Sequence, residues 1–240
     1  MAGAYVGPLG AAFIVTAIAE GKPGLRRWVG RLFKGGFNWR WYALALLGVP
    51  AIIVAGTLIV SPGAEVGMSF PPLTALIVYV PVLLIQMVTT GLAEEPGRRD
   101  FVLVRHQKLH GLLLGTLILG VLWAVWRLPL LVTDWGEGFG GVNLQTILSF
   151  ISFCIVFSIF ITWIFNRTGD SVPVVMLAHV SVNNFVGMLL LAVITTLSPS
   201  VSALLWGIKI SFGLVALMLI VMTRGKLGYQ PELQDDRGVK

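Results

Sequence analysis

Two adjacent carboxylates, Glu94 and Glu95, end a long hydrophobic stretch and are the first candidates for chemistry in this sequence. Two arginines, Arg98 and Arg99, follow within about one helical turn. If the helix continues through this segment, Glu95 and Arg99 are i,i+4 neighbours and can form a structural ion pair. That pairing would leave Glu94 free for acid–base chemistry, although Glu94 and Arg98 have the same spacing. The alternative is a charged cap that closes a membrane-spanning helix, and the charge pattern alone favours neither.

A second group of polar residues surrounds Arg127, which comes late in the hydrophobic stretch 111–132. An arginine within such a stretch avoids lipid and either reaches a carboxylate or carbonyl in the interior or extends to an interface. Glu94 and Glu95 are the candidate partners. The tryptophans beside Arg127 favour packing or interface roles over ligand binding.

A third group contains His179 and Asn183, which are i,i+4 neighbours and therefore share a helix face. An imidazole and a carboxamide on one face can donate hydrogen bonds to a carbonyl oxygen and stabilise an oxyanion. Hydrogen bonding between helices is the competing interpretation. A further pair, His106 and His110, could in principle hold a metal, but its basic interfacial surroundings favour a structural role.

These polar groups belong to an unusually apolar chain. Of its 240 residues, 56% are hydrophobic and 12% are charged, whereas a soluble domain carries about 25% charged residues. The composition excludes a water-soluble enzyme and a nucleic-acid-binding domain, and the single cysteine, Cys154, excludes an intrachain disulfide. In such a chain a net charge of +6 reflects membrane topology or contact with anionic lipid. The sequence therefore predicts an all-α polytopic membrane protein with a single domain over residues 1–240.

Six stretches reach the length of about 20 apolar residues that a bilayer-spanning helix needs, and a seventh is shorter. The six are 41–60, 73–93, 111–132, 144–165, 172–195 and 201–222, and the seventh is 4–19. We predict about seven transmembrane helices.

Lysine and arginine are unevenly distributed among the connecting segments. Segments 20–40, 94–110, 166–171 and 223–240 contain 15 of the 17 basic residues, and segments 61–72, 133–143 and 196–200 contain none. Because basic residues accumulate on the cytoplasmic side, we predict a multi-pass protein of the cell membrane with its amino terminus outside and its carboxy terminus in the cytoplasm. The stretch 24–35 suits either a short interfacial helix or a solvated basic loop. The tail 223–240 is predicted to be disordered.

In this order and at these spacings, the three groups resemble the motifs of the CPBP family of intramembrane proteases. The family includes the type II CAAX prenyl endopeptidases and the bacteriocin-processing and immunity proteases. The likeness covers about residues 8–222, with the motifs in a core of about 73–195. It rests on Glu94, Glu95, Arg99 and Phe101, on the segment 123–129, and on His179 and Asn183.

The resemblance implies a helical fold, usually of about eight spans, around an intramembrane cavity open to the cytoplasm. It implies that Glu94 activates water for attack on a peptide carbonyl, and that His179 and Asn183 form the oxyanion hole. It assigns Glu95 and Arg99 a supporting role. The family's metalloprotease label implies a possible zinc ion with no assigned ligands, although a glutamate mechanism without bound metal is at least as plausible. The implied partners are membrane lipid and a peptide or prenylated-protein substrate, and no nucleic acid.

The sequence departs from the family pattern in two motifs. Arg127 stands where the second motif usually has histidine, and Arg98 and Asp100 stand where the first usually has tryptophan and glycine. Arginine keeps its proton, so Arg127 cannot act as a base or as an ordinary metal ligand. Arg98 and Arg127 would also favour the ionised form of Glu94 and weaken it as a base. Losing an acid–base partner typically slows a reaction by about 10²–10⁴-fold.

The sequence leaves three functions open. We expect a CAAX-type intramembrane endopeptidase whose activity Arg127 impairs. The alternative is a catalytically inactive relative that binds a membrane peptide, as a bacteriocin-immunity protein would. A small transporter is disfavoured, because the chain contains no inverted repeat or paired broken helices.

Overall fold

The computed structural model describes residues 5–35, 38–63, 72–137, 141–190 and 201–233, and within these ranges the regular structure is entirely helical. The α-helices are α2 (Ala11–Leu32), α3 (Trp39–Ala43), α4 (Val49–Val60), α5 (Pro72–Gln86), α6 (Leu92–Glu95), α7 (Val104–His110), α8 (Leu112–Arg127), α9 (Asp134–Glu137), α10 (Leu144–Arg167), α11 (Val172–Asn184) and α13 (Val201–Met222). Wider π-type turns are η1 (Tyr5–Gly10), η2 (Leu44–Gly48), η3 (Met87–Gly91), η4 (Pro96–Leu103) and η6 (Phe185–Leu189), and η5 (Leu128–Val132) and η7 (Pro231–Leu233) are 3₁₀ turns.

Five helices in the described ranges are long and apolar enough to cross a membrane. They are Trp39–Val60, Leu76–His110, Leu112–Val132, Leu144–Arg167 and Leu205–Met222, and Val172–Met188 is a shorter apolar helix. The fold class predicted from the sequence, an all-α polytopic membrane protein, is therefore confirmed.

The amino-terminal stretch 4–19 differs from the prediction, since it is not among these five helices. The helix that contains it changes direction at Gly21, whose φ of 62° and ψ of −155° lie outside the helical region. Glycine adopts this conformation without the steric cost that a side chain would add. The apolar segment before this break is therefore short. The following segment is helical through Leu32, which agrees with the first of the two alternatives for 24–35.

The carboxy-terminal segment also differs from the prediction of a disordered tail. Leu227 is completely buried, and the Asn166 side chain donates a 2.9 Å hydrogen bond to its carbonyl oxygen. Residues 223–233 are therefore ordered against the end of α10, and residues 234–240 lie outside the described ranges.

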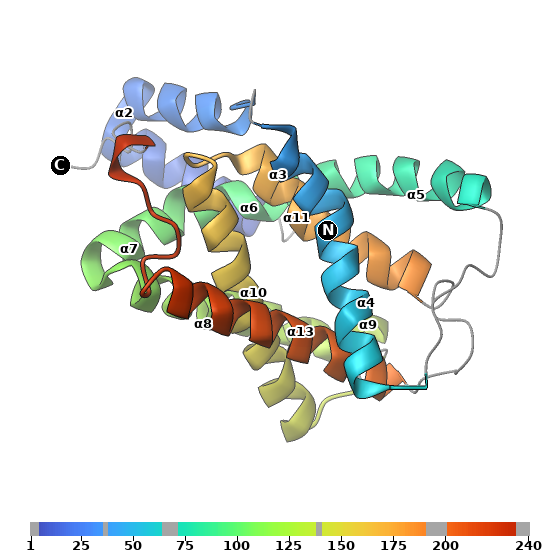
Figure 1. Ribbon diagram of the computed structural model, residues 1–240. Coiled ribbons are helices and arrows are strands. Elements are labelled where there is room, and N and C mark those ends of the chain that lie inside the picture. The colour runs from blue at the N-terminus through green and yellow to red at the C-terminus, as the bar shows by residue number, and fades with distance from the viewer. Residues whose placement is uncertain (1–4, 36–37, 64–71, 138–140, 191–200, 234–240) are drawn as a thin grey trace.

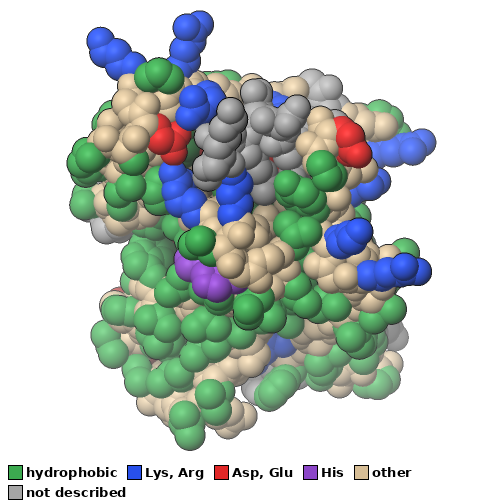
Figure 2. Space-filling model, turned by 90° about the vertical axis from the view of Figure 1, so that its left-hand side faces the viewer, with side chains coloured by type: hydrophobic (Ala, Val, Ile, Leu, Met, Phe, Trp, Pro, Cys, Tyr) green, Lys and Arg blue, Asp and Glu red, His purple; other side chains and the backbone are tan. Residues whose placement is uncertain are grey.

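The core is built around α10, which packs against α8 and α13 (Figure 1). Aromatic rings fill the contact between α10 and α13, where Phe157 and Phe160 lie 5.1 and 5.4 Å from Phe212 between ring centroids. In Figure 1, α2 lies across the top of the bundle. Figure 2 shows Lys and Arg side chains gathered over the upper part of the face in view, and hydrophobic side chains covering most of the lower part. This separation suits a molecule with one end at a membrane surface.

Two glycines allow α4 and α13 to pack with their backbones in contact. A Cβ atom at Gly207 would lie 2.8 Å from the Cα of Thr57 and 3.0 Å from the carbonyl carbon of Gly56. Small residues at helix crossings permit this close approach in membrane proteins, where apolar burial alone does not drive helices together.

Replacing Gly207 with alanine should push α13 away from α4. We expect Gly207→Ala to destabilise the protein by about 1–3 kcal/mol, the usual cost of overpacking a well-packed contact. Thermal unfolding in detergent would measure this. Gly213 is the matched control, because nothing lies within 4 Å of the Cβ position there. Gly213→Ala should be neutral or stabilise by up to about 1 kcal/mol through helix propensity, and equal effects at the two positions would contradict the close packing.

Candidate active site

A cluster of charged side chains lies buried inside the bundle, around the segment α6–η4 of the long helix Leu76–His110. Glu94 is 3% exposed, and Glu95 and Arg99 are each 1% exposed. The backbone here changes from α-helix to the wider turn η4 at Pro96, whose missing amide hydrogen suits the start of a helical segment. Such wide turns are frequent at functional sites.

Glu95 is held by three neighbours. Arg99 Nε donates to its Oε2 at 3.0 Å, and Arg98 Nη2 donates to its Oε1 at 2.8 Å. His179 Nδ1, from α11, lies 2.8 Å from the same Oε1. The i,i+4 ion pair between Glu95 and Arg99 that the sequence predicts is present.

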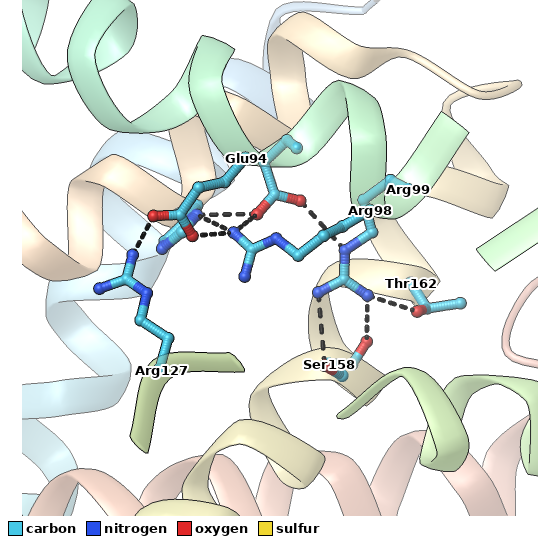
Figure 3. Close-up of polar contacts among 8 residues, drawn as sticks. Glu94, Arg98, Arg99, Arg127, Ser158 and Thr162 are labelled. Atoms are coloured by element: carbon cyan, nitrogen blue, oxygen red, sulfur yellow. Dashed lines mark hydrogen bonds and ion pairs between the residues drawn. The ribbon is translucent and has the colours of Figure 1, made fainter. Parts of the chain in front are cut away.

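Arg99 extends from Glu95 to α10 and ties the two helices together (Figure 3). Its Nη1 donates to the Thr162 hydroxyl at 3.2 Å, and its Nη2 donates to the Ser158 hydroxyl at 3.4 Å. Ser158 and Thr162 were not predicted as site residues. Their i,i+4 spacing was the available signal, because it places both hydroxyls on one face of an apolar helix.

Glu94 contacts arginine at both carboxylate oxygens. Its Oε1 accepts a hydrogen bond from Arg127 Nη2, and its Oε2 lies 2.5 Å from Arg98 Nη2 (Figure 3). Arg127 therefore has the carboxylate partner that the sequence predicts for it. The Arg127 side chain is 15% exposed, whereas those of Glu94 and Arg98 are 4% and 5% exposed.

Aromatic rings hold Arg98 and His179 in place. The Arg98 guanidinium lies 4.4 Å from the ring centroid of Trp123, a cation–π contact that compensates part of its lost hydration. The His179 ring packs edge-on between Trp123 and Phe157, with centroid distances of 5.5 and 5.9 Å. The imidazole is thus oriented by packing as well as by Glu95.

The two asparagines of α11 differ in their surroundings. Asn183, the predicted oxyanion donor, is exposed, whereas its neighbour Asn184 is fully buried. Asn184 donates a 3.0 Å hydrogen bond to the carbonyl of Tyr79 and accepts one of 3.4 Å from Gln86. Asn184 therefore connects helices, and no sequence pattern separates it from Asn183. The role of Asn183 remains a prediction.

The amino-terminal segment covers the cluster. The backbone of Pro8 packs directly on Gly97, and the Trp126 indole Nε1 lies 3.4 Å from the Cβ position of Gly7. Asp100 forms a 2.8 Å ion pair with Arg31 of α2. The resemblance implies an open cavity at Glu94, but here the carboxylate is enclosed. A substrate can reach Glu94 only if this cover or Arg127 moves.

The residues of the cluster do not suit a divalent metal ion. The described part of the chain contains no group of three or more His, Cys, Asp or Glu side chains that could hold a metal. The pair His106 and His110 therefore has no third such ligand among the described residues. Three guanidinium groups already contact the oxygens of the two carboxylates, which leaves one excess positive charge in the cluster. A cation would be repelled by this arrangement, and the metalloprotease label is not supported.

The fold and the site together define a polytopic membrane protein with a buried glutamate–arginine–histidine cluster. A family model described as Rce1-like, type II CAAX prenyl endopeptidase, matches residues 75–186, a range that contains the whole cluster. Over this range, just under half of the chain, the protein is similar to the type II CAAX prenyl endopeptidases, the group that the sequence motifs resemble. No curated protein matches the sequence.

Removing Arg99 should destabilise the protein strongly. Arg99→Met would leave Glu95 buried with fewer compensating charges, and breaking a buried pair in this way costs about 3–5 kcal/mol. The exposed pair between Arg105 and Glu20, with side chains 33% and 30% exposed, provides the control. Arg105→Met should cost less than about 1 kcal/mol. Chemical or thermal unfolding in detergent would compare them, and similar losses would argue against a structural role for Arg99.

Removing divalent metal should leave the protein unchanged. Because the cluster has three cationic side chains around two carboxylates, we expect EDTA to leave the unfolding midpoint unaltered and added Zn²⁺ not to raise it. A ligand that binds only the folded state raises its stability by an amount that grows with the logarithm of the ligand concentration above Kd. A rise in the unfolding midpoint that grows with zinc concentration would therefore contradict this prediction.

Proposed function

We propose that the protein is an intramembrane endopeptidase of the CAAX type, in which Glu94 activates the attacking water and two arginines restrain it at rest. The observation that carries the proposal is the difference between the two carboxylates. Glu95 is fixed by Arg99 and His179 in the deepest part of the cluster. Glu94 contacts only Arg98 and Arg127, of which Arg127 is the most exposed cationic side chain in the cluster.

The proposed reaction is hydrolysis of a peptide bond. Glu94 takes a proton from water as the oxygen attacks the carbonyl carbon, and the carbonyl electron pair moves onto its oxygen. The proton then passes to the amide nitrogen as the C–N bond breaks, so that Glu94 returns to its ionised form. The developing oxyanion needs hydrogen-bond donors aimed at it. The Arg127 guanidinium can provide them once it leaves Glu94, and His179 and Asn183 are the donors that the family resemblance implies.

The two guanidinium groups limit this chemistry at rest. Both occupy carboxylate oxygens that would have to take the proton from water, so Glu94 is less available as a base than an unpaired glutamate. Movement of Arg127 onto the substrate would relieve part of this effect. The proposed enzyme is therefore slow until a substrate competes with Glu94 for Arg127.

A second candidate is an inactive relative that binds a membrane peptide. The observation that favours it is the occupation of both Glu94 oxygens by guanidinium groups inside an enclosed site. An excess positive charge in an apolar site would bind a peptide carboxylate without cleaving the chain. In either case we propose a peptide or prenylated protein as the partner. It would approach from the basic end of the molecule, which is the end where Lys and Arg side chains gather (Figure 2). That end would face the cytoplasm of the cell membrane.

Substitution of Glu94 and Arg127 separates the two candidates. Cleavage of a quenched fluorescent library of prenylated and unprenylated peptides would be followed with purified protein in detergent. We expect slow cleavage by the wild type and a loss of at least about 10²-fold in Glu94→Gln, which keeps the shape but cannot accept the proton. Arg127→His should raise the rate, because it frees one oxygen of Glu94 and restores a group that can exchange protons.

Arg105→His is the matched control, since it makes the same replacement at an ion pair outside the cluster. It should leave the rate unchanged. Cleavage that persists in Glu94→Gln would contradict Glu94 as the base. An inactive wild type and an inactive Arg127→His, combined with peptide binding by both, would favour the binding protein.

A further inference from the structure

A second polar feature lies away from the charged cluster, where the partly buried Lys209 stands within the apolar span Leu205–Met222. Its ammonium group contacts the hydroxyl of Ser149 on α10 and lies 4.3 Å from the ring centroid of Trp206. No carboxylate of the described residues forms an ion pair with it. A lysine in the hydrocarbon region is costly unless its charge finds a partner. A hydroxyl and an aromatic ring compensate only part of that charge.

Lys209 lines a surface groove of about 660 Å³ between α10 and α13. The walls are mainly apolar and include Leu144, Leu148, Trp206 and Ile210. The polar groups are the ammonium group of Lys209, the hydroxyls of Ser149 and Ser152, and the side-chain amide of Gln145. The volume lies in the range of small-molecule sites, which combine apolar walls with a few polar groups. The lining suits a molecule with one anionic end and a long apolar part.

The position of Lys209 along the bundle indicates where its ligand comes from. Trp206 and Lys209 share one face of α13, and Ser149 and Ser152 share the facing side of α10, because each pair is spaced i,i+3. By the helical rise, Ser149 and Lys209 lie about 8 and 12 Å from the first residues of their helices. Side chains on a helix lean toward its amino terminus, so the ammonium group is directed to the near membrane face.

The connecting segments at that membrane face contribute no other cationic side chain. Segments 133–143 and 196–200, which precede α10 and α13, contain no lysine or arginine. Phospholipid phosphates occupy the boundary that a snorkelling lysine reaches. The charge of the groove is therefore complementary to a phosphate at the level of the lipid headgroups, and its apolar walls are continuous with the exposed leucines Leu144 and Leu148.

We propose that the groove between α10 and α13 binds one anionic phospholipid, with the lipid phosphate on Lys209 and Ser149 and an acyl chain along Leu144, Leu148 and Ile210. The site is separate from Glu94 and does not depend on whether the protein is a peptidase. It would join α10 to α13 on the side of the bundle opposite the basic end, and a bound lipid would stabilise the folded state by mass action.

Native mass spectrometry of the full chain in detergent tests this proposal. Phosphatidylglycerol and phosphatidylcholine with identical acyl chains would be titrated onto the wild type and three variants of Lys209 and Lys108. We expect the wild type to retain one phosphatidylglycerol in preference to phosphatidylcholine. Lys209→Met should weaken phosphatidylglycerol binding about fivefold or more, the effect expected for one lysine at a lipid surface. Lys209→Arg should retain binding, and Lys108→Met, in α7, should leave it unchanged.

Two further measurements keep the result interpretable. Leu148→Trp should weaken binding while keeping the charge, because the indole fills the groove. It also serves if Lys209→Met fails to fold, as judged by gel filtration and circular dichroism. Inorganic phosphate should not raise the unfolding midpoint, since it lacks the acyl chain. Equal retention of both lipids by the wild type, unchanged binding in Lys209→Met, an equal loss in Lys108→Met, or stabilisation by phosphate alone would overturn the proposal.

Discussion

The mutual neutralisation of two carboxylates by three guanidinium groups inside an apolar bundle is the interaction on which the rest of this structure depends. Glu94 and Glu95 cannot remain buried without Arg98, Arg99 and Arg127, and other helices contribute further contacts to the cluster. Arg99 donates hydrogen bonds to hydroxyl groups of α10, and Arg98 makes a cation–π contact with Trp123 of α8. Glu95 contacts His179 of α11. The positions of these helices around the long helix Leu76–His110 are therefore set by charge compensation as well as by apolar packing.

The amino-terminal segment adds a second layer to this arrangement. Pro8 packs on Gly97, and Arg31 pairs with Asp100, whose side chain is fully buried. Burial excludes water and strengthens the ion pairs beneath, but it also separates Glu94 from any substrate. The contacts that stabilise the charged cluster therefore also block access to Glu94, so the amino-terminal segment or Arg127 has to move before a substrate can react there. Exclusion of water is useful during hydrolysis only when a single water remains positioned for attack.

The excess of one positive charge gives the site its chemical character. It repels a cation and favours an anionic group such as an oxyanion or a peptide carboxylate. Replacement of the usual histidine by Arg127 is therefore more than the loss of a proton-transfer group. It changes the electrostatics of the whole cluster, and the second arginine, Arg98, acts in the same direction on the other oxygen of the same carboxylate.

The sequence by itself determined the helical membrane fold, the ion pair between Glu95 and Arg99, and the pairing of Arg127 with one of the two glutamates. These follow from apolar length, from i,i+4 spacing, and from the cost of an unpaired charge in lipid, all of which are local or nearly unconditional constraints. Only the tertiary structure decided that Asp100 pairs with Arg31, that Asn184 rather than Asn183 is buried, and that 223–233 is ordered. Each of these depends on the rotation of a helix or on a partner far away in the chain. The spacing of residues along one helix determines neither the rotation of that helix nor its distant partner, because the buried face depends on the helices packed around it.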